Sequence, residues 1–288
     1  MSAIDLSTLI NRAERVLAQL EAWLPPIPPE IDWSAHAFRW RKEGSRGWLD
    51  TVRHVSTIDL GDLQHIERQK EIIDRNTRHF LQGKPANNVL MTGARGTGKS
   101  SLVKAMLAAY GDQGLRLIEV DKTDMGDLGH IVDLVGKRPE RFIIFCDDLS
   151  FEEGEPGYKA LKSVLDGSIS ASGDNVLIYA TSNRRHLMPE YMSENLAARH
   201  QPDGEIHPGE TVEEKVSLSE RFGLWLSFYP FKQDDYLDIV YHWLRVLGCK
   251  PEDVASSRTE ALQWALERGS RSGRVARQFA RDWAARHV

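Results

Sequence analysis

The segment GARGTGKS, residues 93–100, combines three glycines, a lysine and a hydroxyl in the order G-x-x-x-x-G-K-S. The glycines let the backbone curl so that successive N–H groups face a phosphate chain. Lys99 can then reach the β- and γ-phosphates of a nucleotide, and the Ser100 hydroxyl can coordinate Mg²⁺. A chance match is the competing interpretation, and the strand and helix patterns that flank the motif argue against it. The residues expected to bind phosphate are Gly93, Ala94, Arg95, Gly96, Thr97, Gly98, Lys99, Ser100 and Ser101.

A pair of acids follows the apolar run FIIFC and supplies the second half of this chemistry. A phosphate loop needs a carboxylate at the end of a buried strand to help hold magnesium, and Asp147 stands there. Asp148 comes next and can orient or deprotonate an attacking water. The alternative is a purely structural role, in which both acids cap the following turn. Three further acids, Glu152, Glu153 and Glu155, read as a solvated loop, although one of them could take the water-orienting role.

Four more polar residues follow in the order that a nucleotide site requires. Asn183 ends the strand pattern VLIYATS, at the edge of a parallel sheet where ligands bind. Its amide can donate to a γ-phosphate and accept from a water. Arg221 precedes the strand pattern LWLSFY, and Arg271 and Arg274 open the last helical pattern. Each arginine alone is more simply a solvated surface cation, and it is their order that favours a site.

The elements that must position these residues alternate between strands and helices. Apolar strand patterns NNVLMTG, LRLIEV, RFIIFCD and NVLIYATS are separated by helical patterns, which predicts a parallel sheet covered on both faces. Helical patterns at about 234–247, 252–268 and 272–287 predict a separate helical subdomain. We therefore expect three parts. They are an N-terminal helix, proline-rich spacer and aromatic-basic arm over 1–57, a nucleotide-binding domain over 58–231, and a helical lid over 232–288.

The aromatic-basic arm, WSAHAFRWRKEGSRGW at residues 33–48, allows two interpretations. Interleaved rings and cations can hold single-stranded nucleic acid. The same rings can instead pack the arm onto the main body while the cations face water, and this is favoured because no known nucleic-acid module frames them.

The totals exclude several classes of protein. A chain of 288 residues that is 41% hydrophobic can bury a substantial core, and a formal net charge of -5 argues against wholesale coating of nucleic acid. Cys146 and Cys249 do not make a disulfide framework, so a reducing compartment is expected. Without a signal-peptide pattern or an apolar run long enough to span a bilayer, we expect a cytoplasmic protein that does not enter membranes.

Together, the segments NNVLMTGARGTGKSSLVKA, FIIFCDDLSFEEGE, YATSNRRHL, SERFGLWLSFYPF and GSRSGRVARQF resemble the AAA+ ATPase superfamily, and in particular a bacterial family of AAA+ proteins without an assigned role. The resemblance covers roughly residues 58–285. It implies a P-loop NTPase fold with a five-stranded parallel sheet in the order 5-1-4-3-2, a small all-helical lid, and assembly into a homo-oligomeric ring or filament.

The resemblance also implies a role for each candidate residue. Gly93–Ser100 match the Walker A loop, and Asp147 and Asp148 match the Walker B acids. Asn183 matches the polar sensor, Arg221 the arginine finger, and Arg274 the sensor arginine of the lid, which adds Arg274 to the nucleotide-binding residues.

Two departures from the family pattern bear on mechanism. Asp148 stands where AAA+ proteins usually have Glu, and the shorter side chain withdraws the carboxylate by about 1.5 Å, which favours slow, switch-like hydrolysis. The stretch DKTDMGDLGH is acidic, where protein-threading relatives carry an aromatic pore loop.

The leading hypothesis is an ATPase that uses Mg²⁺ and ATP to remodel or load a macromolecular client, either protein or nucleic acid. A slowly hydrolysing ATP-dependent switch or scaffold and, less readily, a P-loop phosphotransferase are the alternatives. The long polar segment 192–216 contains His200, Glu205, His207 and Glu210, which could suggest a metal site, although a surface loop is the favoured interpretation.

Overall fold

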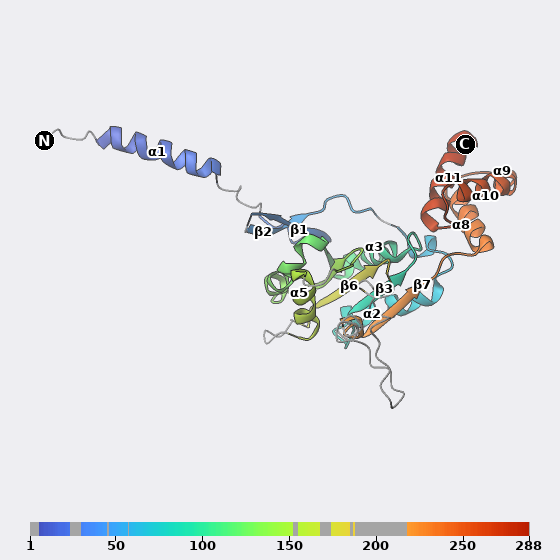
Figure 1. The fold of residues 1–288 in the computed structure, drawn as a ribbon, viewed down its shortest axis with the longest axis horizontal. Coiled ribbons are helices and arrows are strands. Elements are labelled where there is room, and N and C mark those ends of the chain that lie inside the picture. The colour runs from blue at the N-terminus through green and yellow to red at the C-terminus, as the bar shows by residue number, and fades with distance from the viewer. Residues whose placement is uncertain are drawn as a thin grey trace, which may run out of the picture.

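The computed structural model describes residues 6–23, 30–44, 46–56, 58–151, 155–167, 174–184, 187 and 218–287. Its centre is a seven-stranded sheet in the order β2-β1-β4-β5-β6-β3-β7 (Figure 1). The strands are β1 (Ala37–Glu43), β2 (Arg46–Thr51), β3 (Val89–Gly93), β4 (Leu115–Val120), β5 (Arg141–Cys146), β6 (Val176–Ser182) and β7 (Leu224–Phe228). All neighbouring pairs are parallel except β1 and β2.

The sheet confirms the predicted strand order and corrects the predicted strand number. The five expected strands occupy the order β7-β3-β6-β5-β4, which is 5-1-4-3-2 when they are counted along the chain. The hairpin of β1 and β2 adds two strands beyond β4, with Phe38 opposite Ile118. Residues 37–51, which were expected in an N-terminal arm, therefore lie in the sheet.

The hairpin joins the sheet because its side chains alternate between apolar and charged. Phe38 and Trp40 are each 1% exposed, and Trp33 packs against the ring of Phe38. On the other face, Arg39 forms an ion pair with Glu119 of β4 at 2.6 Å. This arrangement supports the packing interpretation of the aromatic-basic segment, since the rings of Phe38 and Trp40 are buried and those of Trp33 and Trp48 are half-buried.

Helices cover both faces of the sheet, as the alternation of patterns predicts. On one face α2 (Glu67–Leu81) and α3 (Lys99–Tyr110) pack against side chains such as Met91 and Phe145. On the other, α4 (Leu128–Val135) and α5 (Pro156–Leu165) pack against Leu90 and Ile144. Short 3₁₀ turns lie at Leu60–Asp62, Gly111–Gln113 and Lys122–Asp127. Helix α2 begins at Glu67, shortly after His65 with its positive φ of 61°.

The lid consists of α8 (Gln233–Val246), α9 (Pro251–Ser256), α10 (Arg258–Glu267) and α11 (Gly273–His287), drawn in orange and red in Figure 1. Buried Tyr236 of α8 and Phe279 of α11 contribute to its core. The second helical pattern was expected to be continuous but divides at Ser257, whose hydroxyl donates to the carbonyl of Val254 at 2.7 Å. The N–H of Ser257 donates to the same carbonyl at 3.4 Å, so α9 ends there in a tighter i→i+3 turn.

The N-terminal helix α1 (Leu6–Trp23) agrees with the predicted amphipathic helix. Both cysteines are buried free thiols. Among the described residues, no helix combines the length and the apolarity needed to cross a bilayer.

Candidate functional site

The phosphate loop joins β3 to α3, and its glycines are required by its geometry. Gly93 has φ = 130°, and a Cβ there would lie 1.9 Å from the carbonyl oxygen of Phe228. Gly98 has φ = 100° and forms the N-cap of α3. Left-handed backbone of this kind strongly favours glycine. The loop therefore wraps at the N-terminus of α3, where the helix dipole favours an anion.

Lys99 lies inside this loop and is only 5% exposed. Its Nζ donates to the carbonyl oxygens of Gly93 and Ala94, both at 2.8 Å, and to Oδ1 of Asn183 at 3.1 Å. Burial lowers the pKa of the Lys99 ammonium, and the carboxylates of Asp147 and Asp148 act in the opposite direction. The cation is thus held where a phosphate chain in the loop would meet it.

The first acid lies close to the hydroxyl at the start of α3. Ser100 Oγ donates to Asp147 Oδ1 at 2.7 Å, and Thr181 Oγ1 donates to the same oxygen at 2.5 Å. A carboxylate and a hydroxyl that meet in this way form an oxygen donor set suited to Mg²⁺. Within the described ranges, no group of three or more His, Cys, Asp and Glu side chains is placed to hold a metal.

The second acid adopts an unusual backbone conformation. Asp148 has φ = 52°, in the left-handed region that Asp and Asn tolerate better than most residues. Its N–H donates to Thr181 Oγ1 at 2.9 Å, and its carboxylate accepts a hydrogen bond from Asn183 Nδ2. The left-handed turn therefore directs the carboxylate of Asp148 toward the amide of Asn183.

Thr181 is the central residue that the sequence did not identify. It is 1% exposed, donates to Asp147 and accepts from the backbone of Asp148, so one hydroxyl fixes both acids. Thr181 stands two residues before Asn183. Side chains of a strand alternate between its faces, and this period of two could have placed both residues on the same side.

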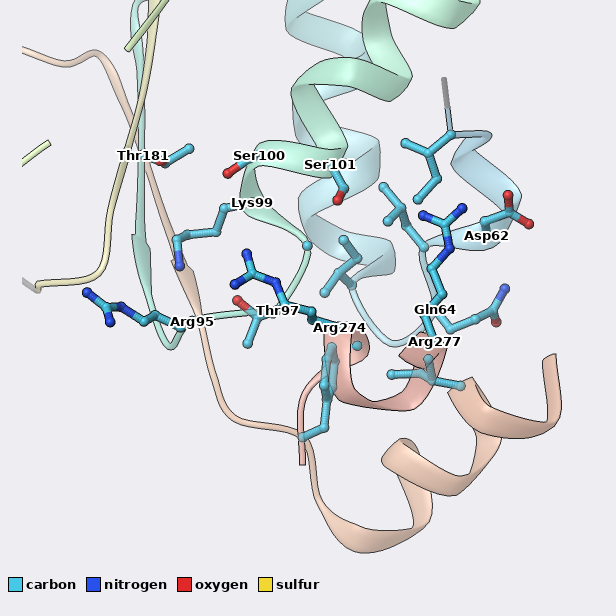
Figure 2. A pocket seen from close by; sticks show the side chains of 18 of the residues that line it. Asp62, Gln64, Arg95, Thr97, Lys99, Ser100, Ser101, Thr181, Arg274 and Arg277 are labelled. Atoms are coloured by element: carbon cyan, nitrogen blue, oxygen red, sulfur yellow. The ribbon is translucent and has the colours of Figure 1, made fainter. Parts of the chain in front are cut away.

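A cavity of about 620 Å³, here called the phosphate-loop cavity, brings these groups together (Figure 2). Lys99, Ser100, Asp147, Asp148 and Asn183 all line it. Arg274 and Arg277 of α11 also line it, and both are labelled in Figure 2; of the two, only Arg274 was among the predicted site residues. Apolar side chains that suit a nucleobase complete the wall: Ile58, Leu63, Ile66, Phe231, Ile239 and Trp243.

The lid is tied to the phosphate loop through the backbone. The N–H of Gly273, at the start of α11, donates to the carbonyl oxygen of Gly96 at 2.9 Å. Gly96 has φ = 72°, and a Cβ on it would lie 2.8 Å from the side chain of Ser272. The phosphate loop and the first turn of α11 are therefore in direct contact.

Some candidates lie elsewhere. Arg221 does not line the cavity within this chain, and its Nε donates to Asp166 after α5. Arg271 lines a second cavity, together with Arg95. Glu155 pairs with Lys122 at 3.1 Å. Glu152, Glu153 and the set of His200, Glu205, His207 and Glu210 lie outside the described residues.

Comparison with solved structures identifies the class of fold. Three variants of RuvB from Thermotoga maritima match with TM-scores of 0.50 to 0.52 and sequence identities of 13–14%. The match covers 77% of this chain and 63–64% of theirs, so it spans less than two thirds of those proteins. RuvB is an AAA+ ATPase, and the fold of this chain is of the AAA+ type.

The family model described as "Protein of unknown function (DUF815)" matches residues 33–287, and the chain belongs to this family. The match begins just before β1, so it includes the hairpin as well as the sheet and lid. Among curated proteins, none matches the sequence.

Proposed function

We propose that this protein binds ATP with Mg²⁺, hydrolyses it to ADP and phosphate, and uses the resulting conformational change to remodel or load a macromolecular client. The observation that carries this proposal is the convergence of Lys99, Ser100, Asp147, Asp148 and Asn183 on one cavity. The AAA+ fold and the phosphate-loop motif support the same conclusion. A phosphotransferase would leave Asn183 and Arg274 without a role.

In this proposal each part of the cavity has one task. The N–H groups of the phosphate loop and the ammonium of Lys99 bind the phosphate chain, and Arg274 approaches it from the lid. The base lies against apolar side chains such as Ile66 and Trp243. Because the lid contributes both Arg274 and Trp243, a nucleotide in the cavity contacts both parts of the protein. Binding can then favour one lid position over others.

Ser100 and Asp147 would hold Mg²⁺, since they supply the hydroxyl and carboxylate oxygens that this ion accepts. Bound there, Mg²⁺ would supply positive charge that offsets the negative charge of the phosphates. Thr181 keeps the Asp147 carboxylate turned toward Ser100 through its 2.5 Å hydrogen bond. It therefore acts as a positioning residue.

Asp148 and Asn183 are the proposed partners of the attacking water. The carboxylate accepts a proton or hydrogen bond from the water, and the amide fixes the direction of the carboxylate. Aspartate tolerates the left-handed backbone at position 148 better than most residues do, so the local backbone suits the shorter acid. The aspartate is accordingly not a defective substitute for glutamate.

Arg221 is proposed to act on the nucleotide of a neighbouring copy, because it pairs with Asp166 and does not line its own cavity. An arginine finger supplied by a neighbour contributes about 10³–10⁵ in rate in related nucleotidases. A single copy of the chain then hydrolyses ATP very slowly, and assembly into a homo-oligomer raises the rate.

The test is the rate of phosphate release per protomer at increasing protein concentration, with and without DNA. We expect the specific rate to rise with concentration and to require Mg²⁺. A rate that is constant over the whole range would contradict action between copies, and no Mg²⁺-dependent release at any concentration would contradict an ATPase. Stimulation by DNA would identify a nucleic-acid client, and a client protein is expected if DNA has no effect.

A further inference from the structure

A second cavity lies between the phosphate loop and the lid, and it is not used by the proposed reaction. Its volume is about 890 Å³, and we call it the lid groove. Its lining comes from three segments of the chain, within residues 94–97, 230–233 and 258–272. Arg95, Thr97 and Phe231 also line the phosphate-loop cavity, so the two are neighbours.

The charge of the lid groove is of one sign. Arg95, Arg258 and Arg271 are all exposed, and no Asp or Glu is among the lining residues. None of the three guanidinium groups forms an ion pair with a residue that the structure describes. This stands out in a chain whose formal net charge is -5. A ligand for this groove must therefore bring negative charge.

The floor of the lid groove is apolar and mostly aliphatic. Leu266 is 81% exposed, and Leu262 and Ala265 lie on the same helix, α10. Exposed apolar side chains beside arginines are typical of the binding surfaces that proteins use for other proteins. Single-stranded nucleic acid would need exposed rings for its bases to stack on. Among the described residues that line the groove, the one aromatic ring is that of Phe231, which is 9% exposed.

We propose that the lid groove docks an acidic segment of a protein partner, with an aliphatic side chain against Leu262 and Leu266 and carboxylates paired with Arg258 and Arg271. The proposal rests on the proposed function only in naming this partner as the client. An amphipathic helix with leucines on one face and glutamates beside them has the required chemistry.

The position of the lid groove links the docking of a partner segment to the binding of nucleotide. Arg271 precedes Ser272 and Gly273, which contact Gly96 of the phosphate loop. A segment that binds Arg271 and Arg95 together therefore touches the lid and the loop at once. Its affinity is expected to change when ATP moves the lid, and by linkage its presence changes the affinity for ATP by the same factor.

The experiment measures fluorescence anisotropy of a short fluorescein-labelled amphipathic peptide of leucine and glutamate, titrated with the full-length protein in the absence of nucleotide. A matched peptide with lysine in place of glutamate, and a labelled oligo(dT), serve as the competing ligand classes. The variants are Arg258→Glu with Arg271→Glu, and separately Leu266→Asp. Arg245→Glu, on the exposed end of α8 and outside the groove, is the matched control.

We expect the acidic peptide to bind the wild-type protein and the Arg245→Glu control equally. The paired arginine variant and Leu266→Asp should each weaken binding by about tenfold or more. All of the substituted residues are exposed, so the variants should fold, which circular dichroism checks. Acidic-peptide binding that is unchanged in both variants, or absent from the wild type, would overturn the proposal.

Two other results would also overturn the proposal, and each would assign the lid groove to a different ligand. Tighter binding of oligo(dT) that is lost in the arginine variant would assign the groove to nucleic acid. Self-association that is lost in the same variant, without binding of the acidic peptide, would assign it to a second copy of this chain. Because the titration uses no ATP, a protein that binds the peptide but never hydrolyses ATP would refute the proposed function and leave the groove assignment standing.

Discussion

The phosphate-loop cavity and the lid groove share Arg95, Thr97 and Phe231 but differ in the chemistry around them. The cavity gathers Asp147, Asp148 and Asn183 from the ends of two strands, whereas the groove has no acid in its lining. Metal and water chemistry requires oxygen atoms placed to within a fraction of an ångström, which only the strand ends of the sheet provide here. Docking requires matching charge and apolar area, which one helix and two loops can supply.

The largest expected effect separates the two regions. Lys99→Ala removes the buried cation from the phosphate loop, and charged hydrogen bonds of this kind contribute about 1.5–3 kcal/mol each. We expect affinity for ATP to fall by roughly 10- to 100-fold in isothermal titration calorimetry. Binding of the acidic peptide in the groove should remain. Lys159→Ala, at an exposed position on α5, is the control. Unchanged ATP binding by the Lys99 variant would refute the phosphate-loop assignment.

The next substitution tests whether the cavity and the lid are linked. Gly96→Ala forces a side chain into a left-handed backbone and places its Cβ 2.8 Å from Ser272, at a cost of about 1–2 kcal/mol. We expect ATP affinity to fall about tenfold and the amide of Gly273 to exchange its hydrogen faster. Gly129→Ala on α4 is the matched control, since nothing lies within 4 Å of an added Cβ. If the hydrogen-exchange rate of the Gly273 amide were unchanged in the Gly96 variant, the hydrogen bond between Gly273 and Gly96 would not contribute to the link between loop and lid.

A third and smaller effect tests the shape of the catalytic acid. Asp148→Glu restores the residue usual in the AAA+ superfamily but lengthens the side chain by about 1.5 Å from a left-handed backbone. We expect the hydrolysis rate to fall by roughly tenfold, with the KM for ATP nearly unchanged, because the carboxylate moves away from the amide of Asn183. A faster variant would mean that the shorter acid limits the natural enzyme.

These predictions rest on residues that the sequence identified to different degrees. The glycines and Lys99 could be recognised because a contiguous loop carries its whole geometry in a few residues. Asp147, Asp148 and Asn183 were found because parallel strands end at the same edge of the sheet. The hydrogen bonds that link Asp147 to Asp148 run through Thr181, whose role arises only when β5 and β6 pair.

The regions that the sequence did not reveal depend on contacts between distant segments. The strands β1 and β2 were assigned to an arm that packs on the main body with its cations facing water. Arg39 and Lys42 in fact pair with Glu119 and Asp127 of the main body. The lid groove combines residues 94–97 with residues 258–272, and neither segment shows a docking pattern by itself. The role of Arg277 in the cavity was missed for the same reason.

The most direct test of the central claim is turnover by the Asp148→Asn variant under conditions where the wild-type protein hydrolyses ATP. The amide keeps the size of the side chain but cannot accept a proton from water. We predict that the variant binds Mg²⁺-ATP with nearly unchanged affinity and releases phosphate at least about 100-fold more slowly. Full turnover by the variant would contradict the assignment of Asp148 as the group that activates water.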